Sequence, residues 1–489
     1  MAKRTAIIDI GSNSARMVVF EKSSHLTYHL IKEVKSRVRI SEGAYENGGV
    51  LQKIPLQRTY DALEGYKNII KTLKCRKVFC VATSALRDAP NSRDFIKKIE
   101  QNLKIYIKII DGKKEAYYGG IAAKNLLMPI VDATTIDIGG GSTELALIEN
   151  RKITDTLSIN IGTVRLKELF LDKKIDRDEI ENYIKNKIQE IPQKFKNHNL
   201  IVIGGTTRSL SELIMKKIEY PLETVHGFRY KLDEHIAHMR DIKYTDTINL
   251  KRFNIKKERV DTIREGLYIF DEISKKLESK EIITSGVGVR EGVYLCDLLR
   301  NYNHSFPQNF KLSLRSLTDR FSLKDRQNNS IVRYTKELFY ALEYLHQVDE
   351  KYLDILTTSA KLYNIGMVLN YYEKNLHSFY FIINGLNYGF SHDEKILIAL
   401  LIKYHMKKLP STDDLKAYKN LLPDIKIVNW LSFILSLSNC LHKDLADDKF
   451  TFKYENHTLY IKSHKKLYLA KECIKKLAKP ATFAIVLTQ

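Results

Sequence analysis

TAIIDIGSNS at residues 5–14 and TTIDIGGGS at residues 134–142 share one pattern: a short apolar strand ends in Asp-Ile-Gly and meets a turn of small residues. A second alternating strand follows each turn, at 15–22 and 143–150. Alternating strands on both sides of a short turn predict an antiparallel pair. Because strand, tripeptide and turn recur together, we expect a duplicated supersecondary unit and not a chance repeat.

The order of elements after each copy is also repeated. A third strand comes first, and helix and strand then alternate. These elements are expected at 26–34, 54–74, 77–83 and 105–110 after the first copy, and at 153–159, 164–194, 200–204 and 281–286 after the second. Such an order is typical of an α/β domain with helices packed on a mixed sheet. The duplication therefore predicts two similar domains that face each other, residues 1–125 and 126–302.

The last third of the chain has a different pattern. A polar, aperiodic stretch, NYNHSFPQNF, begins at residue 301 and is typical of a linker. Helical periodicity dominates from 312 to about 440, and a hairpin, a helix and a short strand follow. We therefore predict a mainly α-helical domain at 303–445 and a small α+β end at 446–489.

Composition limits the classes of protein to which the 489-residue chain can belong. Hydrophobic residues make up 44% of it, enough for packed cores. The net charge of +22 favours an anionic partner but does not distinguish nucleic acid, a membrane surface and a phosphorylated substrate. No apolar stretch reaches the ~20 residues that span a bilayer. The five cysteines form no recognisable disulfide framework, so we expect a cytoplasmic protein without disulfides and without a membrane partner.

Both turns are candidate phosphate sites. Successive backbone N–H groups in a Gly/Ser turn point the same way, no Cβ blocks approach, and the hydroxyls add donors. An ordinary hairpin turn is the alternative for either copy alone, but two equivalent copies favour phosphate binding. The strand–glycine–helix junction at 204–209 is a weaker candidate, with a simple helix start as the alternative. The candidate phosphate ligands are Gly11, Ser12, Asn13, Ser14, Gly139, Gly140, Gly141, Ser142, Thr143, Gly205 and Thr206.

Acidic residues flank the two turns. Asp137 and Glu144 lie on either side of the second turn, and Asp9 precedes the first. Carboxylates that point at a bound phosphate repel it unless a cation such as Mg²⁺ lies between them. These three residues are therefore candidate Mg²⁺ ligands, with turn capping as the alternative.

Two further residues are candidates for catalysis and phosphate binding. Glu115 opens a predicted helix after the strand at 105–110, where it could serve as a general base for an attacking water. The alternative is a glutamate placed there by the helix dipole. Arg87 ends a strand beside a helix start, where a guanidinium can clamp phosphate oxygens, or it is a structural surface arginine.

Basic residues alternate in KSRVRISEG at 35–43, which places Lys35, Arg37 and Arg39 on one face of an extended segment. Beside two phosphate turns, such a face predicts a track for a long polyanion; a solvated edge strand is the alternative. No G-x-x-x-x-G-K-[ST] loop occurs, and the glycines at 286–292 do not match the dinucleotide fingerprint. Hydrolysis at a P-loop and dinucleotide redox chemistry are therefore not expected.

The chain resembles the exopolyphosphatase/guanosine pentaphosphate phosphohydrolase family. The matching segments are DIGSNS, RVRISEG, ATSALRDA, IIDGKKEA, DIGGGSTE, IGTVRLKELF, GGT and SGVGVREGV, in this order within residues 1–300. The resemblance implies the acetate and sugar kinase/Hsc70/actin fold for the duplicated domains. It also implies that Glu115 is the catalytic base, that Arg87 is a phosphate ligand, and that Asp137 and Glu144 lie at the metal.

The implied reaction is Mg²⁺-dependent release of terminal orthophosphate from inorganic polyphosphate, or conversion of guanosine pentaphosphate to the tetraphosphate. Water would attack phosphorus with assistance from Glu115, in the cleft between the two domains. The residues assigned to the polyanion track are Lys35, Arg37, Arg39 and Arg165. Two alternatives stay open: an ATP-dependent kinase of the same fold, and a non-catalytic protein that binds phosphate or nucleotides. No signature of a specific nucleic-acid-binding module occurs.

Longer members of this family carry a helical domain similar to HD phosphohydrolases, and residues 312–440 resemble it. This chain has Tyr363-Asn364 where an active HD domain has its His-Asp metal dyad. A literal His392-Asp393 falls in a different part of the family pattern. We therefore expect a domain that binds or dimerises without catalysis, and the resemblance suggests a homodimer.

Overall fold

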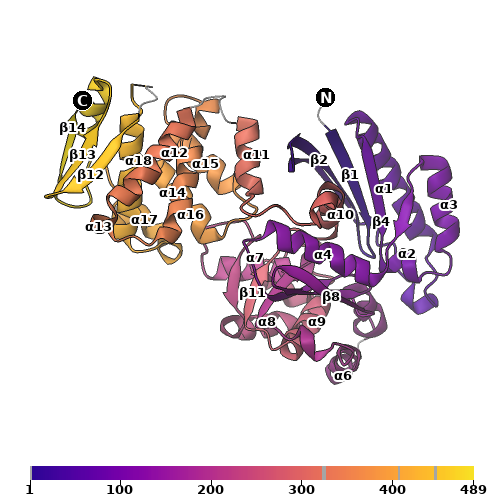
Figure 1. Cartoon of the computed structure of the whole chain (residues 1–489). Coiled ribbons are helices and arrows are strands. Elements are labelled where there is room, and N and C mark those ends of the chain that lie inside the picture. The colour runs from indigo at the N-terminus through magenta and orange to yellow at the C-terminus, as the bar shows by residue number, and fades with distance from the viewer. Residues whose placement is uncertain (1–2, 174, 322–326, 406–407, 445–448, 489) are drawn as a thin grey trace. The chain divides into compact units, whose positions relative to one another are not determined.

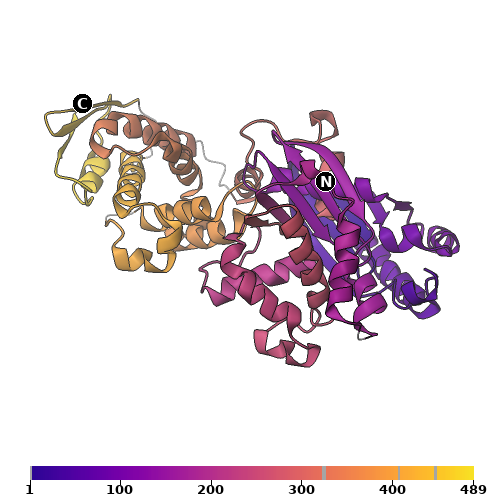
Figure 2. The same ribbon diagram turned by 90° about the horizontal axis from the view of Figure 1, so that it is seen from below.

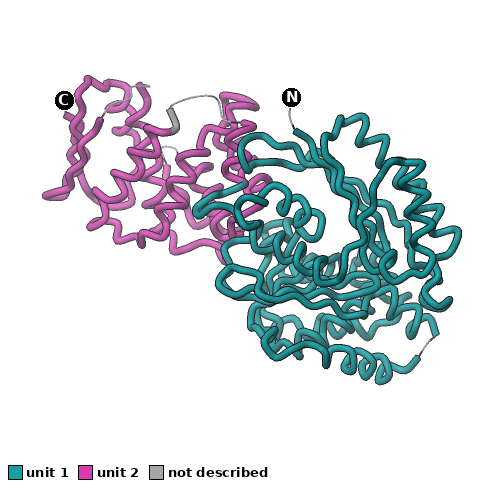
Figure 3. The backbone as a smooth tube through the Cα atoms, turned by 45° about the vertical axis from the view of Figure 1, so that its right-hand side comes forward, with its two compact units in different colours: residues 1–312 teal, residues 313–489 magenta. Residues whose placement is uncertain are grey.

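The computed structural model describes residues 3–488 except 174, 322–326, 406–407 and 445–448. It divides into two compact units, residues 1–312 and 313–489 (Figure 3). The first unit therefore runs past the predicted boundary at 302, because the expected linker packs on it: His304 Nδ1 lies 2.8 Å from the Tyr117 hydroxyl. The predicted boundary between 445 and 446 lies outside the described residues.

Unit 1 contains two sheets built on the same plan. Their strand orders are β3-β2-β1-β4-β5 and β10-β11-β9-β6-β7-β8. In each, the first three strands in the chain pair antiparallel, and later strands add in parallel on the other side of the first; only β10, at the edge of the second sheet, is antiparallel to its neighbour β11. The first sheet comprises β1 (Lys3–Ile10), β2 (Ala15–Ser24), β3 (Thr27–Ser36), β4 (Lys77–Ala82) and β5 (Ile107–Ile109). The second comprises β6 (Ala133–Ile138), β7 (Thr143–Glu149), β8 (Lys152–Ile159), β9 (Asn199–Ile203), β10 (Arg229–Lys231) and β11 (Glu281–Thr284).

The repeated sequence pattern thus builds two similar α/β lobes, which confirms the predicted duplication and the actin-like type of fold. We call the lobe of the first sheet lobe 1 and that of the second sheet lobe 2. Their helices are α1 (Lys53–Thr72), α2 (Ser84–Asp88), α3 (Ser92–Leu103), α4 (Gly112–Leu126), α5 (Thr163–Leu166), α6 (Arg177–Ile188), α7 (Gly205–Lys217), α8 (Ile236–Tyr244), α9 (Ile263–Lys276) and α10 (Val289–Leu298) (Figures 1 and 2).

Strand alternation decides which helices cover which face. In β9, Leu200 and Val202 belong to the core beneath α7 and α9, whereas Ile201 and Ile203 face α4. These four side chains are fully or almost fully buried, so both faces of the second sheet are covered, as expected for parallel strands. In lobe 1, helices α1 and α3 cover one face of the sheet and α10 lies against β1 (Figure 1).

Helices α4 and α10 are exchanged between the lobes. Helix α4 follows the last strand of the first sheet but packs on β6, β7 and β8 of the second. Helix α10 follows the second sheet but packs on β1. The two helices meet at Gly292, where a Cβ would lie 2.0 Å from the backbone oxygen of Tyr118. The sequence boundary at 125 assigns α4 to the first domain, but the contacts of α4 place it on lobe 2.

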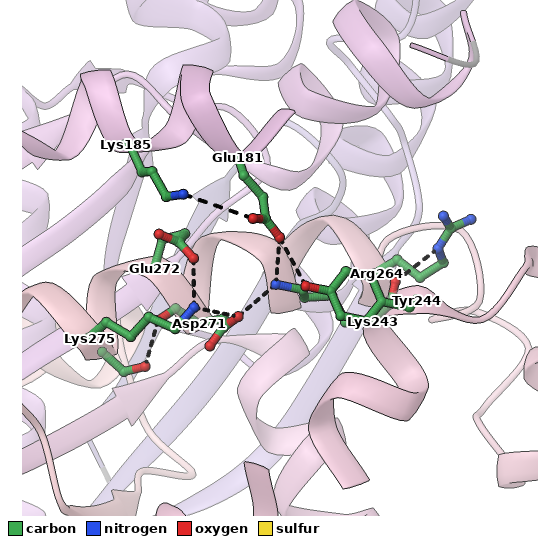
Figure 4. Close-up of polar contacts among 9 residues, drawn as sticks. Glu181, Lys185, Lys243, Tyr244, Arg264, Asp271, Glu272 and Lys275 are labelled. Carbon is green, nitrogen blue, oxygen red and sulfur yellow. Dashed lines mark hydrogen bonds and ion pairs between the residues drawn. The ribbon is translucent and has the colours of Figure 1, made fainter. Parts of the chain in front are cut away.

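Lobe 2 also contains a buried ion network that has no part in the predicted site (Figure 4). The Lys243 side chain on α8 is fully buried, and its Nζ lies 2.6 Å from Asp271 Oδ2 and 3.0 Å from Glu181 Oε1. Lys275 also reaches Asp271, at 3.1 Å. Hydrogen bonds to these acids raise the Lys243 pKa against the opposing effect of burial. The network joins α6, α8 and α9 through charge.

Unit 2 is mainly helical and ends in a small three-stranded sheet. Helices α12, α14, α16 and α18 pack on one another. The helices are α11 (Leu312–Phe321), α12 (Gln327–Ala341), α13 (Glu343–His346), α14 (Leu353–Leu362), α15 (Lys374–Gly385), α16 (His392–Tyr404), α17 (Thr412–Leu415), α18 (Ile425–Leu441) and α19 (Tyr468–Ile474). The strands are β12 (Thr451–Glu455), β13 (Thr458–Lys462) and β14 (Ala484–Thr488), in the order β12-β13-β14.

Two histidines of unit 2, His346 and His392, have structural positions. His392-Asp393 begins α16 inside a capping box, in which the N-cap Ser391 Oγ accepts from the backbone N–H of Glu394. His346 uses both ring nitrogens within its own segment, with Nε2 2.8 Å from the Phe339 carbonyl. Among the described residues, no three His, Cys, Asp or Glu side chains form a group placed to hold a metal.

One expectation about unit 2 is wrong. Cys440 at the end of α18 and Cys473 in α19 form a disulfide, although we expected none. The sequence separation of 33 residues hides this proximity, which arises because α19 packs against α18.

Within the described residues, no single helix is long and apolar enough to cross a membrane. Thr412–Leu421 and Ile425–Leu441 meet that criterion only as a pair bent by 112°.

Candidate functional site

The two glycine turns have the same hydrogen-bonded geometry. The Gly11 N–H donates to the Ser14 carbonyl at 3.1 Å, and the Gly139 N–H donates to the Ser142 carbonyl at 2.9 Å. The first N–H of each turn is therefore used to close it. Among the described residues, the following N–H groups, of Ser12, Asn13, Gly140 and Gly141, have no backbone acceptor.

Neighbouring backbone satisfies the carbonyl groups of both turns. In lobe 1, the N–H groups of Arg39 and Ser41 donate to the carbonyls of Asn13 and Ser12, at 3.0 and 3.3 Å. In lobe 2, backbone N–H groups at the start of α5 donate to the turn carbonyls; the Val164 N–H donates to the Gly140 carbonyl at 2.8 Å. A carbonyl oxygen would repel a phosphate, so this arrangement leaves donors as the free groups of each turn.

The turns of the two lobes lie in contact. A Cβ on Gly140 would lie 2.8 Å from Ser12 Cβ, and Ser12 Oγ is 3.1 Å from Ser84 Oγ. Beside this contact is a cavity of about 150 Å³ between the lobes. The predicted site residues that line the cavity are Asp9, Gly11, Ser12, Asn13, Ser14, Glu115, Asp137, Gly139, Gly140, Ser142, Glu144, Gly205 and Thr206.

Strand register gives the two lobes different charges at equivalent positions. Asp9 pairs across β1 and β2 with Arg16, whereas Asp137 pairs across β6 and β7 with Glu144. Burial raises the pKa of Asp9, against the effect of Arg290 and Arg16. Burial also raises the pKa of Asp137 to about 6, although Arg208 opposes it. Lobe 1 thus contributes an acid, Asp9, opposite an arginine, and lobe 2 contributes two acids, Asp137 and Glu144, opposite each other.

The acidic pair of lobe 2 fits a divalent cation. Burial raises the pKa of Glu144, the hydrogen bond to Ser142 opposes this, and the nearby charge of Asp137 raises it further. Like charges directly opposite each other in a sheet are destabilising. Mg²⁺ takes one or two carboxylates and fills its other positions with water and phosphate oxygens, so two oxygen-bearing residues are a sufficient donor set. Asp137 and Glu144 therefore suit Mg²⁺, with Asp9 beside them.

Glu115 lies in the first turn of α4, which the exchange of helices places between the lobes. The Asp111 side chain caps this helix by accepting from the Lys114 N–H at 2.7 Å. The Glu115 carboxylate lies 3.3 Å from Arg87 Nη1. Its pKa is raised well above the ordinary value by burial and then by the charges of Glu144 and Asp9. Such a carboxyl holds a proton near neutral pH more firmly than an exposed glutamate does.

Four arginines in the cavity were not predicted. Arg16, Arg208, Arg259 and Arg290 line its walls. Burial and the neighbouring arginines lower the pKa of Arg208 to about 10, and its Nε donates to the Ser285 carbonyl at 2.8 Å. Arg290 pairs with Glu33 at 2.7 Å. Arg16, Arg208 and Arg290 lie in or beside the quoted motifs, and Arg259 lies outside them; only their common direction in the fold shows that all four share a cavity.

The basic residues of the predicted track face acids of lobe 2. Lys35 Nζ lies 3.5 Å from Glu258 Oε2. Arg37 pairs with Asp261 at 2.7 Å, and Arg39 pairs with the same carboxylate. All three basic residues lie outside the cavity lining, so their role as a polyanion track stays a prediction.

Arg165 is separate from the other three track residues. Its Nε donates to the Gly141 carbonyl at 3.0 Å, and its Nη2 lies 3.2 Å from Asp88 of lobe 1. Its guanidinium also stacks 4.6 Å from the centre of the Tyr45 ring. Arg165 therefore positions the second turn and links the lobes.

Three predicted phosphate ligands, Thr143, Gly141 and Arg87, do not line the cavity. The Thr143 hydroxyl donates to the Ile161 carbonyl at 2.7 Å, and Thr143 is fully buried. A Cβ on Gly141 would lie 2.4 Å from the Tyr45 hydroxyl, so Gly141 allows the lobes to approach. Arg87 lies at the edge and reaches the site through Glu115.

Changing Glu144 to glutamine should stabilise the metal-free protein at alkaline pH. A buried carboxyl with a raised pKa binds its proton more tightly in the folded state than in the unfolded state. Its contribution to stability therefore falls as pH rises from about 4.5, the ordinary glutamate value, through the raised pKa. Thermal unfolding in EDTA should give a higher Tm for Glu144→Gln than for wild type at pH 8.5, and a smaller difference at pH 5. Equal Tm values at pH 8.5 would contradict the raised pKa.

The comparisons with known proteins agree with this geometry. The model of the Ppx/GppA phosphatase family matches residues 18–301, and the model of Ppx/GppA phosphatase, domain III, matches residues 311–478. The chain belongs to the Ppx/GppA phosphatase family. The family resemblance noted from the sequence is thereby confirmed.

Individual members of the Ppx/GppA family are similar over most of the chain. A guanosine-5'-triphosphate,3'-diphosphate pyrophosphatase of Pseudoalteromonas translucida is 26% identical over 83% of this chain and 81% of its own. A crystal structure of an Aquifex aeolicus family member covers 62% of this chain and 99% of its own, at 27% identity and a TM-score of 0.53.

A bifunctional 3-dehydroquinate synthase/phosphatase of Fusobacterium nucleatum is 30% identical over 57% of this chain. The match spans only 44% of that longer protein. The matched part of this chain therefore has a counterpart in a longer protein whose name also includes a 3-dehydroquinate synthase.

Proposed function

We propose that this Ppx/GppA protein hydrolyses the terminal phosphoanhydride bond of a phosphate chain, either inorganic polyphosphate or guanosine pentaphosphate. One observation carries the proposal: a buried carboxylate on an exchanged helix shares one cavity with two glycine turns from opposite lobes. The turns offer donors to the phosphates, and the carboxylate faces the same space. A site built in this way binds the end of a phosphate chain beside a general base.

The chain's own residues perform three tasks in this proposal. The free N–H groups of the turns at 11–14 and 139–142 bind the terminal phosphates. Arg16, Arg208 and Arg290 balance the negative charge of the chain within the cavity. With the substrate held in place, catalysis requires a correctly oriented water and relief of negative charge more than covalent chemistry.

Glu115 orients the attacking water and accepts its proton. Arg87, 3.3 Å away, holds the carboxylate in place and lowers its pKa against the effect of burial. The proton leaves the water as its oxygen attacks phosphorus, and the leaving phosphate chain takes up the bonding electrons of the broken anhydride. Glu115 must be ionised for this step, so activity should fall as pH decreases through its raised pKa.

Asp137 and Glu144 would hold Mg²⁺, with Asp9 as a further candidate. When bound, the ion would neutralise phosphate charge and polarise the phosphoryl oxygens. The same charge would lower the pKa values that burial has raised in these acids. The acids therefore become better ligands as the site fills.

Two other functions within this fold make different demands. A kinase needs a binding site for a second substrate, the phosphate acceptor, whereas a general base beside two phosphate-binding turns is sufficient for hydrolysis by water. A non-catalytic binding protein has no need for the buried Glu115 carboxylate, whose charge opposes the binding of phosphate. Hydrolysis is therefore the function that the site supports best.

Orthophosphate release tests the proposal. We expect release from long-chain polyphosphate, from guanosine pentaphosphate or from both, in the presence of Mg²⁺ and with loss of activity in EDTA. Comparison of kcat/KM for the two substrates would establish the preference. Binding of either substrate without release would favour the non-catalytic alternative, and transfer of phosphate to a small acceptor would favour a kinase. A homodimer, a cytoplasmic location and the lack of nucleic-acid and membrane partners stay predictions.

A further inference from the structure

A second cavity of unit 1 lies at the opposite end of β1 from the glycine turns. It measures about 540 Å³ and begins at Lys3, the first residue of the strand. Asp9, at the other end of β1, lines the hydrolytic cavity. The two residues are six positions apart along the strand, which corresponds to about 20 Å at the usual strand rise. The two cavities are therefore distinct sites.

Cations from β1, β2, the start of β4 and the segment after α10 meet in this second cavity. Strand pairing places Lys3 directly opposite Lys22 across β1 and β2. The parallel strand β4 begins beside them, where the Arg76 N–H donates to the Arg4 carbonyl at 2.9 Å. The cationic residues that line the cavity are Lys3, Arg4, Lys22, Arg76, Lys77 and Arg300.

Acidic side chains neutralise only part of this charge. Asp297 pairs with both Lys77 and Arg300, at 2.8 and 3.2 Å. Glu21 pairs with Arg4 at 2.6 Å. Within the described part of the chain, the remaining three, Lys3, Lys22 and Arg76, have no acidic partner.

An anion in the cavity would relieve repulsion among these cations. Like charges directly opposite each other on neighbouring strands repel. Lys3 and Arg76 are exposed, so water screens part of this repulsion, but both line one hollow with the half-buried Lys22. A multivalent anion would convert several repulsive pairs into charge-assisted hydrogen bonds.

Aromatic groups form another wall of the cavity. His25 Nε2 lies 2.9 Å from the Tyr302 hydroxyl, and the two rings meet edge to face. Tyr302 is 38% exposed, and the buried Tyr294 on α10 also lines the cavity. The volume exceeds that of the hydrolytic cavity, so it can hold a group larger than one phosphate.

We propose that this cavity is a second anion site, which binds a phosphate-rich molecule without hydrolysing it. The shared chemistry is a chain of phosphates, free or carried by a nucleoside. Neither the glycine turns nor Glu115 line this cavity, so the cavity lacks the groups that we assign to hydrolysis. Helix α10 takes part in both sites: Arg290 near its start lines the hydrolytic cavity, and Tyr294 and Asp297 line this one.

Equilibrium binding of inorganic tripolyphosphate, followed by titration calorimetry in EDTA, tests the second site. The acids of the hydrolytic cavity repel phosphate without Mg²⁺, so in EDTA we expect one tripolyphosphate molecule per wild-type chain, bound at the second site. The double variant Lys22→Gln/Arg76→Gln should bind it about tenfold more weakly for each cation removed. Its Tm without ligand should be no lower than that of wild type, because repulsive charges are removed. The matched control, Lys216→Gln/Lys217→Gln, removes two exposed lysines that line neither cavity and should bind as wild type does.

The outcomes separate this inference from the proposed hydrolysis. One molecule per wild-type chain, lost or weakened in Lys22→Gln/Arg76→Gln, would support the second site and leave the proposed hydrolysis to the separate assay of phosphate release with Mg²⁺. Unchanged binding in the double variant, or no binding to wild type, would overturn the second site. A parallel titration with GTP identifies the source of the phosphates. If GTP binds more tightly than tripolyphosphate, and Tyr302→Ala removes this gain in affinity, the ligand is a phosphate chain carried by a nucleoside. If GTP binds more weakly than tripolyphosphate, the ligand is a free phosphate chain.

Discussion

Glu115→Gln should reduce kcat for orthophosphate release by a factor of about 10² to 10⁴, the usual contribution of a general base. Glutamine keeps the size of the side chain and can hydrogen-bond a water, but it cannot accept a proton from it. KM should stay within a few-fold of wild type, because the glycine turns and the arginines that hold the phosphates are unchanged. The measurement is steady-state phosphate release with the preferred substrate at saturating Mg²⁺.

The pH dependence of kcat distinguishes a catalytic role of Glu115 from a purely structural one. In wild type the acidic limb of kcat should lie above the ordinary glutamate pKa, because burial and the charges of Glu144 and Asp9 raise the pKa of Glu115. Activity requires the ionised form, so the rate rises with pH through that limb. The residual activity of Glu115→Gln should lack the limb. Glu64→Gln, a change at an exposed position on α1, is the matched control. A Glu115→Gln rate within tenfold of wild type would remove this residue from the mechanism.

The duplicated architecture could be predicted because it depends on local patterns that are each repeated. The strands at 5–10 and 134–138 alternate apolar residues, and each ends in the same tripeptide and turn. Equivalent hydrogen bonds at Gly11 and Gly139 show that the repeat extends to backbone geometry. The exchange of α4 and α10 could not be predicted, because a helical pattern shows which face is apolar but not which sheet it covers.

Residues of the candidate site could be predicted where one short motif contains both the reactive side chains and the turn that positions them. Asp137 and Glu144 flank a turn, and strand register then places them opposite each other. Arg208 and Arg290 were missed because their shared direction depends on the packing of β9, β11 and α10, which no local spacing encodes. The acid that Arg37 and Arg39 share, Asp261, lies more than 200 residues away along the chain. The disulfide was missed for the same reason of distance along the chain.

Lys243→Met should destabilise unit 1 by about 3 kcal/mol, at the lower end of the range for breaking a buried ion pair. The change leaves Asp271, which is 3% exposed, without its closest cation, 2.6 Å away. Lys275 still reaches Asp271 at 3.1 Å, but its side chain is half exposed, so it compensates only in part. Methionine fills most of the volume of lysine, so the loss reports on charge more than on packing. Chemical unfolding followed by circular dichroism measures the difference.

Two companion variants show whether the effect arises from an uncompensated buried charge. Lys185→Met removes a lysine that is 52% exposed and 4.0 Å from Glu181, so it should cost less than about 1 kcal/mol. Lys243→Met/Asp271→Asn removes both charges of the buried pair and should recover much of the stability lost in the single variant, because no ionised group is then left without a partner. If Lys243→Met is no more harmful than Lys185→Met, or if the second change adds to the loss, the network in Figure 4 does not stabilise lobe 2 through charge pairing.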